Sequence, residues 1–273
     1  MINTVHLFPV LDEKLIGLLK SLSVDDWNKP TLAKLWTVKD IAAHLLDGNT
    51  RTICLSRDAQ PLIPDREINS YETLVAYLNQ LNADWVKAFK RVSPPVLIEW
   101  LESSGKQYSD YIATLDPEAN AQFSVAWAGE EVSKNWFHIA REYTEKFHHQ
   151  QQIREAVGKP GIMTKDLFYP FIETLMHGQP HNYRNVVAEK GQSVQITVDS
   201  EIGGDWFLTF DGTRWLLSKT SAGKPEGRII IPANISWKVF TKGITPEFAA
   251  SQCSFEGNKS LLLPAIGMIA IMG

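Results

Sequence analysis

The spacing of the apolar residues changes near residue 185, and this change limits the folds that a chain of 273 residues can adopt. Before it, apolar residues recur every three or four positions, which is the period of an amphipathic helix. After it, they alternate in short stretches between turn residues, which is typical of β-strands. The length suits two ordinary domains. We therefore predict a mainly α-helical domain over residues 1–160 and a small α+β domain over residues 161–273.

The first part has five segments with the helical period: 9–22, 37–59, 71–92, 94–115 and 132–157. They are long enough to pack as a helical bundle. Signals for helix ends accompany them. Thr37 and Ser133 are predicted N-caps, and Gly158, followed by Lys and Pro, is predicted to end the fifth helix.

The second part has four stretches that predict strands: 193–200, 205–212, 214–220 and 228–233. A helix over residues 235–243 is expected to follow them. Residues 253–273 are expected to add another strand and helix. These elements make up the predicted α+β domain.

Composition excludes several partners. The formal net charge of −4 provides no broad basic field, so we expect no nucleic-acid partner. The longest apolar run is well short of the roughly 20 residues that span a bilayer, and the first residues lack a secretory signal pattern. The two cysteines, Cys54 and Cys253, are far apart and cannot form a cysteine-rich metal knot. We expect a cytoplasmic protein, a monomer or a homodimer, that acts on small molecules.

The stretch "EKFHHQQQIREAVG" places Glu145 and His149 one turn apart on one helix face. On the helix predicted over residues 37–59, His44 borders the apolar side, and Arg51 lies two turns along nearly the same line. Each helix could thus carry polar ligands at the lip of a bundle. Polar residues at this spacing more often face solvent, however, and a histidine at an apolar edge is more often a structural residue.

Two motifs carry a family resemblance. "LWTVKDIAAHLLDGNTR" resembles the second-helix signature of the DinB-like four-helix bundles. "EKFHHQQQIREAVG" resembles the E-x-x-x-H-x-x-D stretch on the last bundle helix of the mycothiol-dependent maleylpyruvate isomerase family. The resemblance covers nearly the whole chain, and it implies a metal-binding bundle followed by a small α+β domain. It also implies that His44, Glu145 and His149 are the metal ligands. Gln152 stands where the family has Asp, so it could orient a ligand but could not add negative charge.

The implied ligand set gives the site a chemical use. Two imidazoles and one carboxylate leave coordination positions open on a divalent ion, for which zinc is the best candidate and nickel, iron or another first-row metal also fits. A free thiol is only about 3% thiolate at pH 7, and a metal ion removes this limit by deprotonating it. The resemblance implies that a low-molecular-weight thiol adds to a small, electrophilic and acidic substrate, leading to isomerisation or S-transfer. Neither cysteine of the chain is the expected nucleophile.

Several alternatives stay open at this point. Arg51 could bind a carboxylate of the substrate or thiol through its planar fork, although a solvated or salt-bridged arginine is more common at such a position. The same ligands would suit a metal-dependent hydrolase that uses metal-bound hydroxide. The chain could also be a non-catalytic small-molecule-binding protein.

Overall fold

The computed structural model describes residues 1–221 and 223–270, and the chain forms two compact units. The helical unit contains residues 4–116 and 146–162. The sheet unit contains residues 1–3, 117–145 and 163–273. The domain boundary predicted at residue 160 lies two residues before the last change of unit, but the segment 117–145 groups with the sheet unit.

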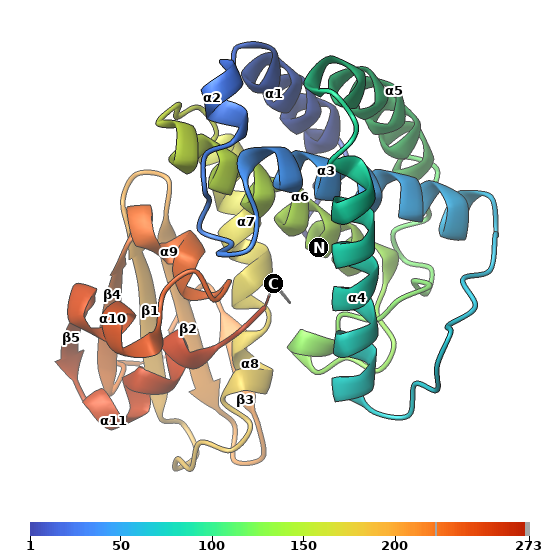
Figure 1. The fold of residues 1–273 in the computed structure, drawn as a ribbon. Helices are drawn as coiled ribbons and strands as arrows, with labels where there is room; N and C mark the ends of the chain where they lie inside the picture. Colours follow the sequence, from blue (N-terminus) through green and yellow to red (C-terminus); the bar gives the residue numbers. More distant parts are fainter. Residues whose placement is uncertain (222, 271–273) are drawn as a thin grey trace. The chain divides into compact units, whose positions relative to one another are not determined.

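The helical unit confirms the helices expected from the apolar period. It contains α1 (Leu7–Lys20), α2 (Val24–Trp27), α3 (Val38–Thr52), α4 (Tyr71–Phe89), α5 (Pro94–Ile112) and the part of α6 (Asn135–Val157) that follows Glu145. A π-helical segment, η1 (Ile53–Arg57), continues α3. Figure 1 shows α3 beside both α4 and α5, and α1 also packs against α5.

Local sequence sets the start of α3 and the end of α6, the two helices that carry His44 and His149. The Thr37 side chain accepts a hydrogen bond from the backbone of Asp40, whose side chain accepts one from the Thr37 backbone, so a capping box starts α3. Gly158 ends α6 with φ of 67°. The Gly158 N–H donates to Glu155 O, and the Lys159 N–H donates to Arg154 O, which is the Schellman arrangement.

The prediction for Ser133 was wrong. Helix α6 begins at Asn135, so Ser133 lies outside the helix. Its hydroxyl instead accepts a hydrogen bond of 2.8 Å from the backbone N–H of Val125 and donates to Glu130. Ser133 therefore stabilises the loop before α6 and does not cap the helix.

Apolar side chains from five helices, α1, α2, α3, α5 and α6, form the core of the helical unit. They include Leu15 and Leu19 of α1, Ile41 and Leu45 of α3, Leu97 and Leu101 of α5, and Ile153 of α6. Each such side chain contributes roughly 1.5–3 kcal/mol when it is fully buried. The stripe of apolar residues at helical spacing is thus the face that each helix turns inward.

The sheet unit confirms the α+β prediction. Its strands are β1 (Ser193–Asp199), β2 (Gly204–Phe210), β3 (Trp215–Ser218), β4 (Gly227–Pro232) and β5 (Ser254–Gly257). They form one sheet in the order β3-β2-β1-β4-β5 (Figure 1), in which only the β1–β4 pairing is parallel. Val194, Ile196 and Val198 of β1 are buried, as expected for a strand with one inward face.

Short helices surround this sheet. They are α7 (Lys165–Met176), α8 (Gln179–Asn182), α9 (Ala233–Val239), α10 (Pro246–Gln252) and α11 (Lys259–Leu262), with 3₁₀ turns η2 (Ala126–Ala128) and η3 (Leu263–Gly267). The sequence pattern did not predict α10. Residues 271–273 of the predicted tail lie outside the described residues. Among the helices that the structure describes, none has the length and apolar character needed to cross a membrane.

Candidate functional site

His44 of α3 and His149 of α6 lie side by side in the helical unit. Their ring centroids are 4.7 Å apart, and the rings meet edge to face at 83°. The Trp36 ring packs against both, at 4.7 Å from His44 and 6.4 Å from His149. The structure therefore brings together two residues that are more than 100 positions apart and that the family resemblance implied as metal ligands.

Both imidazoles are neutral at pH 7. Burial lowers the pKa of His149 to about 4, although the hydrogen bond with Gln152 acts in the opposite direction. Burial also lowers the pKa of His44 well below its ordinary value, and the nearby His149 and Arg51 lower it further. A neutral imidazole keeps one nitrogen lone pair, which a metal ion requires and a protonated ring lacks.

Gln152 fixes the orientation of the His149 ring. The Nδ1 atom of His149 lies 2.9 Å from Oε1 of Gln152, one turn later on α6. Because an amide oxygen only accepts hydrogen bonds, this contact places the imidazole proton on Nδ1 and leaves the lone pair on Nε2. Within the described residues, the buried Nδ1 atom of His44 has no hydrogen-bond partner. His44 and His149 thus offer nitrogen lone pairs in surroundings that are largely shielded from solvent.

Glu145 precedes His149 by one turn of α6, and it is the last α6 residue of the sheet unit. Burial raises the pKa of the Glu145 carboxyl to about 7, which Arg141 opposes and Glu142 reinforces. A nearby cation would favour the ionised form of this carboxyl.

The sequence pattern predicted polar residues at the lip of a bundle, and the structure buries several of those on α6 more deeply, whereas His44 and Glu145 are partly buried. His148, His149 and Gln152 are only 2%, 6% and 6% exposed. Helix α1 helps to cover this part of α6, because Lys146 bonds to Asp12 and Arg154 donates to the Lys14 carbonyl oxygen. The polar sequence therefore belongs to an internal helix whose partners are other side chains and backbone groups.

Arg51 has protein partners on one of its nitrogens. Its Nη2 atom donates to the Asp47 carboxylate and, at 2.9 Å, to Oδ1 of Asn82 on α4. The Asp47 spacing of four residues could have predicted the ion pair, whereas no sequence signal points to Asn82. Among the described residues, Nε and Nη1 of Arg51 make no hydrogen bond. The role of Arg51 toward a carboxylate ligand stays a prediction.

The cysteines are free, and both are partly buried. Burial raises the pKa of the Cys253 thiol to about 11. Such a thiol is almost wholly protonated at neutral pH and is a weak nucleophile.

The predicted metal set is gathered only in part. Among residues 1–221 and 223–270, no group of three or more His, Cys, Asp or Glu side chains is placed to hold a metal ion. The neutral pair of His44 and His149, with the buried Nδ1 atom of His44, fits two of the three predicted positions. Glu145 as the third ligand stays a prediction.

The sequence of residues 8–154 matches the family model described as Mycothiol maleylpyruvate isomerase N-terminal domain. This segment is more than half of the 273 residues. The chain belongs to that family. The resemblance carried by the motifs around His44 and His149 is thereby confirmed.

Solved structures of this family have the same fold. A crystal structure titled as a histidine-to-alanine mutant of the mycothiol-dependent maleylpyruvate isomerase is 10% identical, with a TM-score of 0.54. The match covers 92% of this chain and 90% of that one. A crystal structure of the mycothiol-dependent maleylpyruvate isomerase is 12% identical, with a TM-score of 0.51 over 86% of both chains. No curated protein matches the sequence.

Proposed function

We propose that this family member is a metal-dependent enzyme that activates a low-molecular-weight thiol for addition to a small electrophilic acid. Maleylpyruvate cis–trans isomerisation is the reaction of this type that the family name suggests, and S-transfer by the same thiolate is the other reaction that we propose. The observation that carries the proposal is the close, neutral pair formed by His44 and His149, within the segment that matches the family. A cytoplasmic location and a monomeric or homodimeric state are part of the same proposal.

The residues proposed to hold the metal are His44, Glu145 and His149, with zinc as the first candidate and nickel or iron as others. A divalent ion bound to them would lower the pKa of a thiol from about 8.5 and so supply the thiolate at neutral pH. The neutral state of both imidazoles and the raised pKa of the Glu145 carboxyl support this assignment, because each is a group that a cation would stabilise.

The protein's own side chains would prepare this site before a metal or substrate arrives. Gln152 holds the proton of His149 on Nδ1, so that Nε2 needs no reorientation. The burial of His149 limits competition from water at this donor and strengthens electrostatic interactions there. Trp36 packs against both rings and limits their rotation.

Arg51 is proposed to bind a carboxylate of the acidic substrate or of the thiol. Asp47 and Asn82 hold its Nη2 atom, and the contact with Asp47 draws the guanidinium group back along α3 toward His44. The Nε and Nη1 donors are the groups proposed to meet the ligand. Arg51 also affects the pKa of His44, which supports a position close to that ring.

A thiol-dependence assay tests the proposal. The purified, zinc-loaded chain is incubated with a small cis-unsaturated keto acid, with and without a low-molecular-weight thiol, and the product is followed by its absorbance. We expect turnover only with the thiol, and we expect the C54A/C253A double variant to keep it. Turnover in thiol-free buffer would reject the proposed function and point to hydrolysis.

A further inference from the structure

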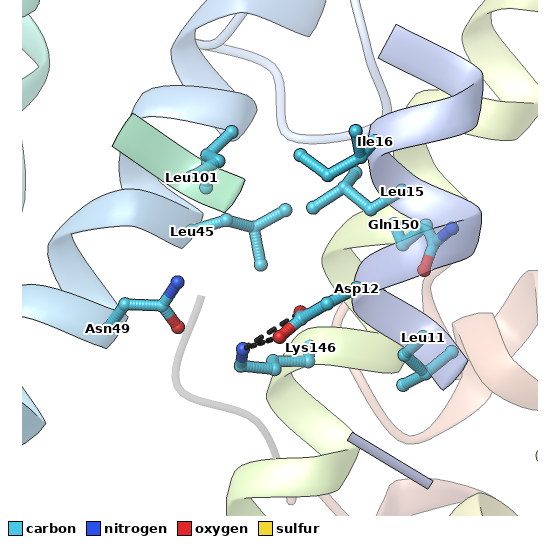
Figure 2. A pocket seen from close by; sticks show the side chains of 9 residues that line it. All are labelled: Leu11, Asp12, Leu15, Ile16, Leu45, Asn49, Leu101, Lys146 and Gln150. Atoms are coloured by element: carbon cyan, nitrogen blue, oxygen red, sulfur yellow. Dashed lines mark hydrogen bonds and ion pairs between the residues drawn. The ribbon is translucent and has the colours of Figure 1, made fainter. Parts of the chain in front are cut away.

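A small cavity lies inside the helical unit, among α1, α3, α5 and the later part of α6 (Figure 2). Its volume of about 10 Å³ is the lower limit for one water molecule and too small for a larger ligand. Five aliphatic side chains line it: Leu11, Leu15, Ile16, Leu45 and Leu101. Asp12, Asn49, Lys146 and Gln150 complete the lining. Purely apolar cavities of this kind stay dry, so the polar residues decide what this one holds.

Lys146 and Asp12 form a mostly buried ion pair at the cavity. The Lys146 Nζ atom lies 2.9 Å from Oδ1 and 3.1 Å from Oδ2 of Asp12, and the two side chains are 11% and 19% exposed. The ammonium group also lies 4.3 Å from the centroid of the Tyr108 ring. An ammonium group has three N–H donors, of which Asp12 takes one or two. At least one donor therefore remains for another acceptor.

Asn49 supplies an acceptor. This residue is 2% exposed, and its Nδ2 atom donates a hydrogen bond of 3.1 Å to Ser104 Oγ on α5. Its Oδ1 atom is buried and has no partner among the described residues. Both residues line the cavity, and in Figure 2 the Lys146 ammonium group lies on the side of Lys146 that is turned toward the Asn49 amide. Buried amide oxygens are almost always hydrogen-bonded, so this one calls for a donor.

Gln150 does not provide that donor. In the orientation that satisfies both polar atoms of its amide, the nitrogen donates to Leu11 O, and the oxygen accepts from Arg154 and from the Leu15 backbone. The Gln150 amide is thus engaged with α1 and with its own helix. Asp12, Asn49 and Lys146 are the groups left to hold a molecule in the cavity.

We propose that the cavity binds one water molecule, which accepts a hydrogen bond from Lys146 Nζ and donates one to Asn49 Oδ1. Its second proton is directed to the Asp12 carboxylate. The water then has three polar partners, within the two to four that buried waters make. It completes a polar layer that takes one side chain from each of four helices: Asp12 from α1, Asn49 from α3, Ser104 from α5 and Lys146 from α6.

This layer lies close to the histidine pair along both helices that carry it. Asn49 follows His44 by five residues on α3, and Lys146 precedes His149 by three residues on α6. A fully hydrogen-bonded layer fixes the register of the helices, because a slip would leave buried donors and acceptors without partners. The water site is a property of the helical unit and does not depend on the proposed function.

A crystal structure of the full chain at 1.5 Å or better tests the site directly. We expect electron density for one fully occupied water within hydrogen-bond distance of Lys146 Nζ and Asn49 Oδ1. Absence of density at this position, or an Asn49 amide turned so that Oδ1 meets a protein donor, would overturn the proposal. The wild-type structure decides it even where a variant fails to fold.

Two variants test which group anchors the water. Asn49→Leu removes the acceptor and places a methyl group in its position, so the water should be lost. Ser104→Ala is the matched control, because it removes a buried polar group of the same layer but keeps Asn49 Oδ1 and the cavity. We expect Ser104→Ala to retain the water. A water that persists in Asn49→Leu, or disappears in Ser104→Ala, would contradict the assignment.

Discussion

Replacing Lys146 with Met should destabilise the helical unit by about 3–5 kcal/mol, the cost of breaking one buried ion pair. The substitution keeps most of the apolar stem but removes the cation that lies 2.9 Å from Asp12. Asp12 would be left as an unpaired carboxylate, although its side chain is only 19% exposed. The cation–π contact with Tyr108 would also be lost, and it accounts for roughly 0.5–2 kcal/mol of this range.

The assay is urea unfolding of the metal-free protein, followed by circular dichroism. With an m-value of about 2 kcal/mol/M, the midpoint should fall by about 1.5–2.5 M. Lys106→Met is the matched control, because the Lys106–Asp110 pair is 77% and 64% exposed and should contribute under about 0.5 kcal/mol. The Asp12→Leu/Lys146→Met double variant should recover most of the loss, since it leaves no charge unpaired. A single-variant loss below about 1 kcal/mol, equal to the control, would refute this reasoning.

Three further predictions concern single residues. Burial lowers the pKa of His138 from 6.5 to about 4. The unfolded state therefore binds the proton more tightly than the folded state, and up to about 3 kcal/mol of stability is lost as the pH falls from 6.5 to 4. In urea unfolding at pH 7 and 4.5, the difference in stability between the two pH values should be smaller for His138→Gln than for the wild-type protein. The pKa of Cys253 is about 11. The rate at which iodoacetamide alkylates this thiol, measured by mass spectrometry, should therefore rise about tenfold per pH unit from pH 8 to 10. A rate that is already constant above pH 8 would contradict this. Gly158→Ala should lower the free energy of unfolding by roughly 1–2 kcal/mol, measured by thermal unfolding, because an L-residue is disfavoured in the left-handed region. Since φ is 67° and an added Cβ meets no atom within 4 Å, this cost would be purely conformational, and an unchanged stability would refute it.

The apolar spacing was sufficient to predict the long helices of the helical unit and the strands of the sheet, but not shorter helices such as α10. Thr37 and Gly158 act at the predicted helix ends because their roles depend on adjacent backbone atoms. The serine at position 133 did not follow its pattern, since its hydroxyl bonds to a loop residue eight positions earlier. Local rules succeed where the partner is local and fail where another segment offers a better one.

The residue types of the candidate site could be predicted from the sequence, but the burial of these residues could not. The motifs identified His44 and His149, and the family resemblance implied that Gln152 could orient a ligand, as its contact with His149 now shows. The polar composition of α6 indicated a solvent-facing edge, whereas the structure buries it. Its partners come from α1, for example Asp12, more than 100 residues away. No periodicity in one helix can reveal such long-range pairing.

Zinc titration of the metal-free full chain by calorimetry tests the central claim most directly. The account predicts about one zinc ion per chain for the wild-type protein and for His6→Ala, a control at an exposed histidine. His44→Ala and Glu145→Ala should bind at least about 100-fold more weakly, since even the loss of residues that only orient ligands costs about 10- to 100-fold. Zinc binding of unchanged strength in both variants, or none in the wild-type chain, would contradict the proposed metal-dependent function.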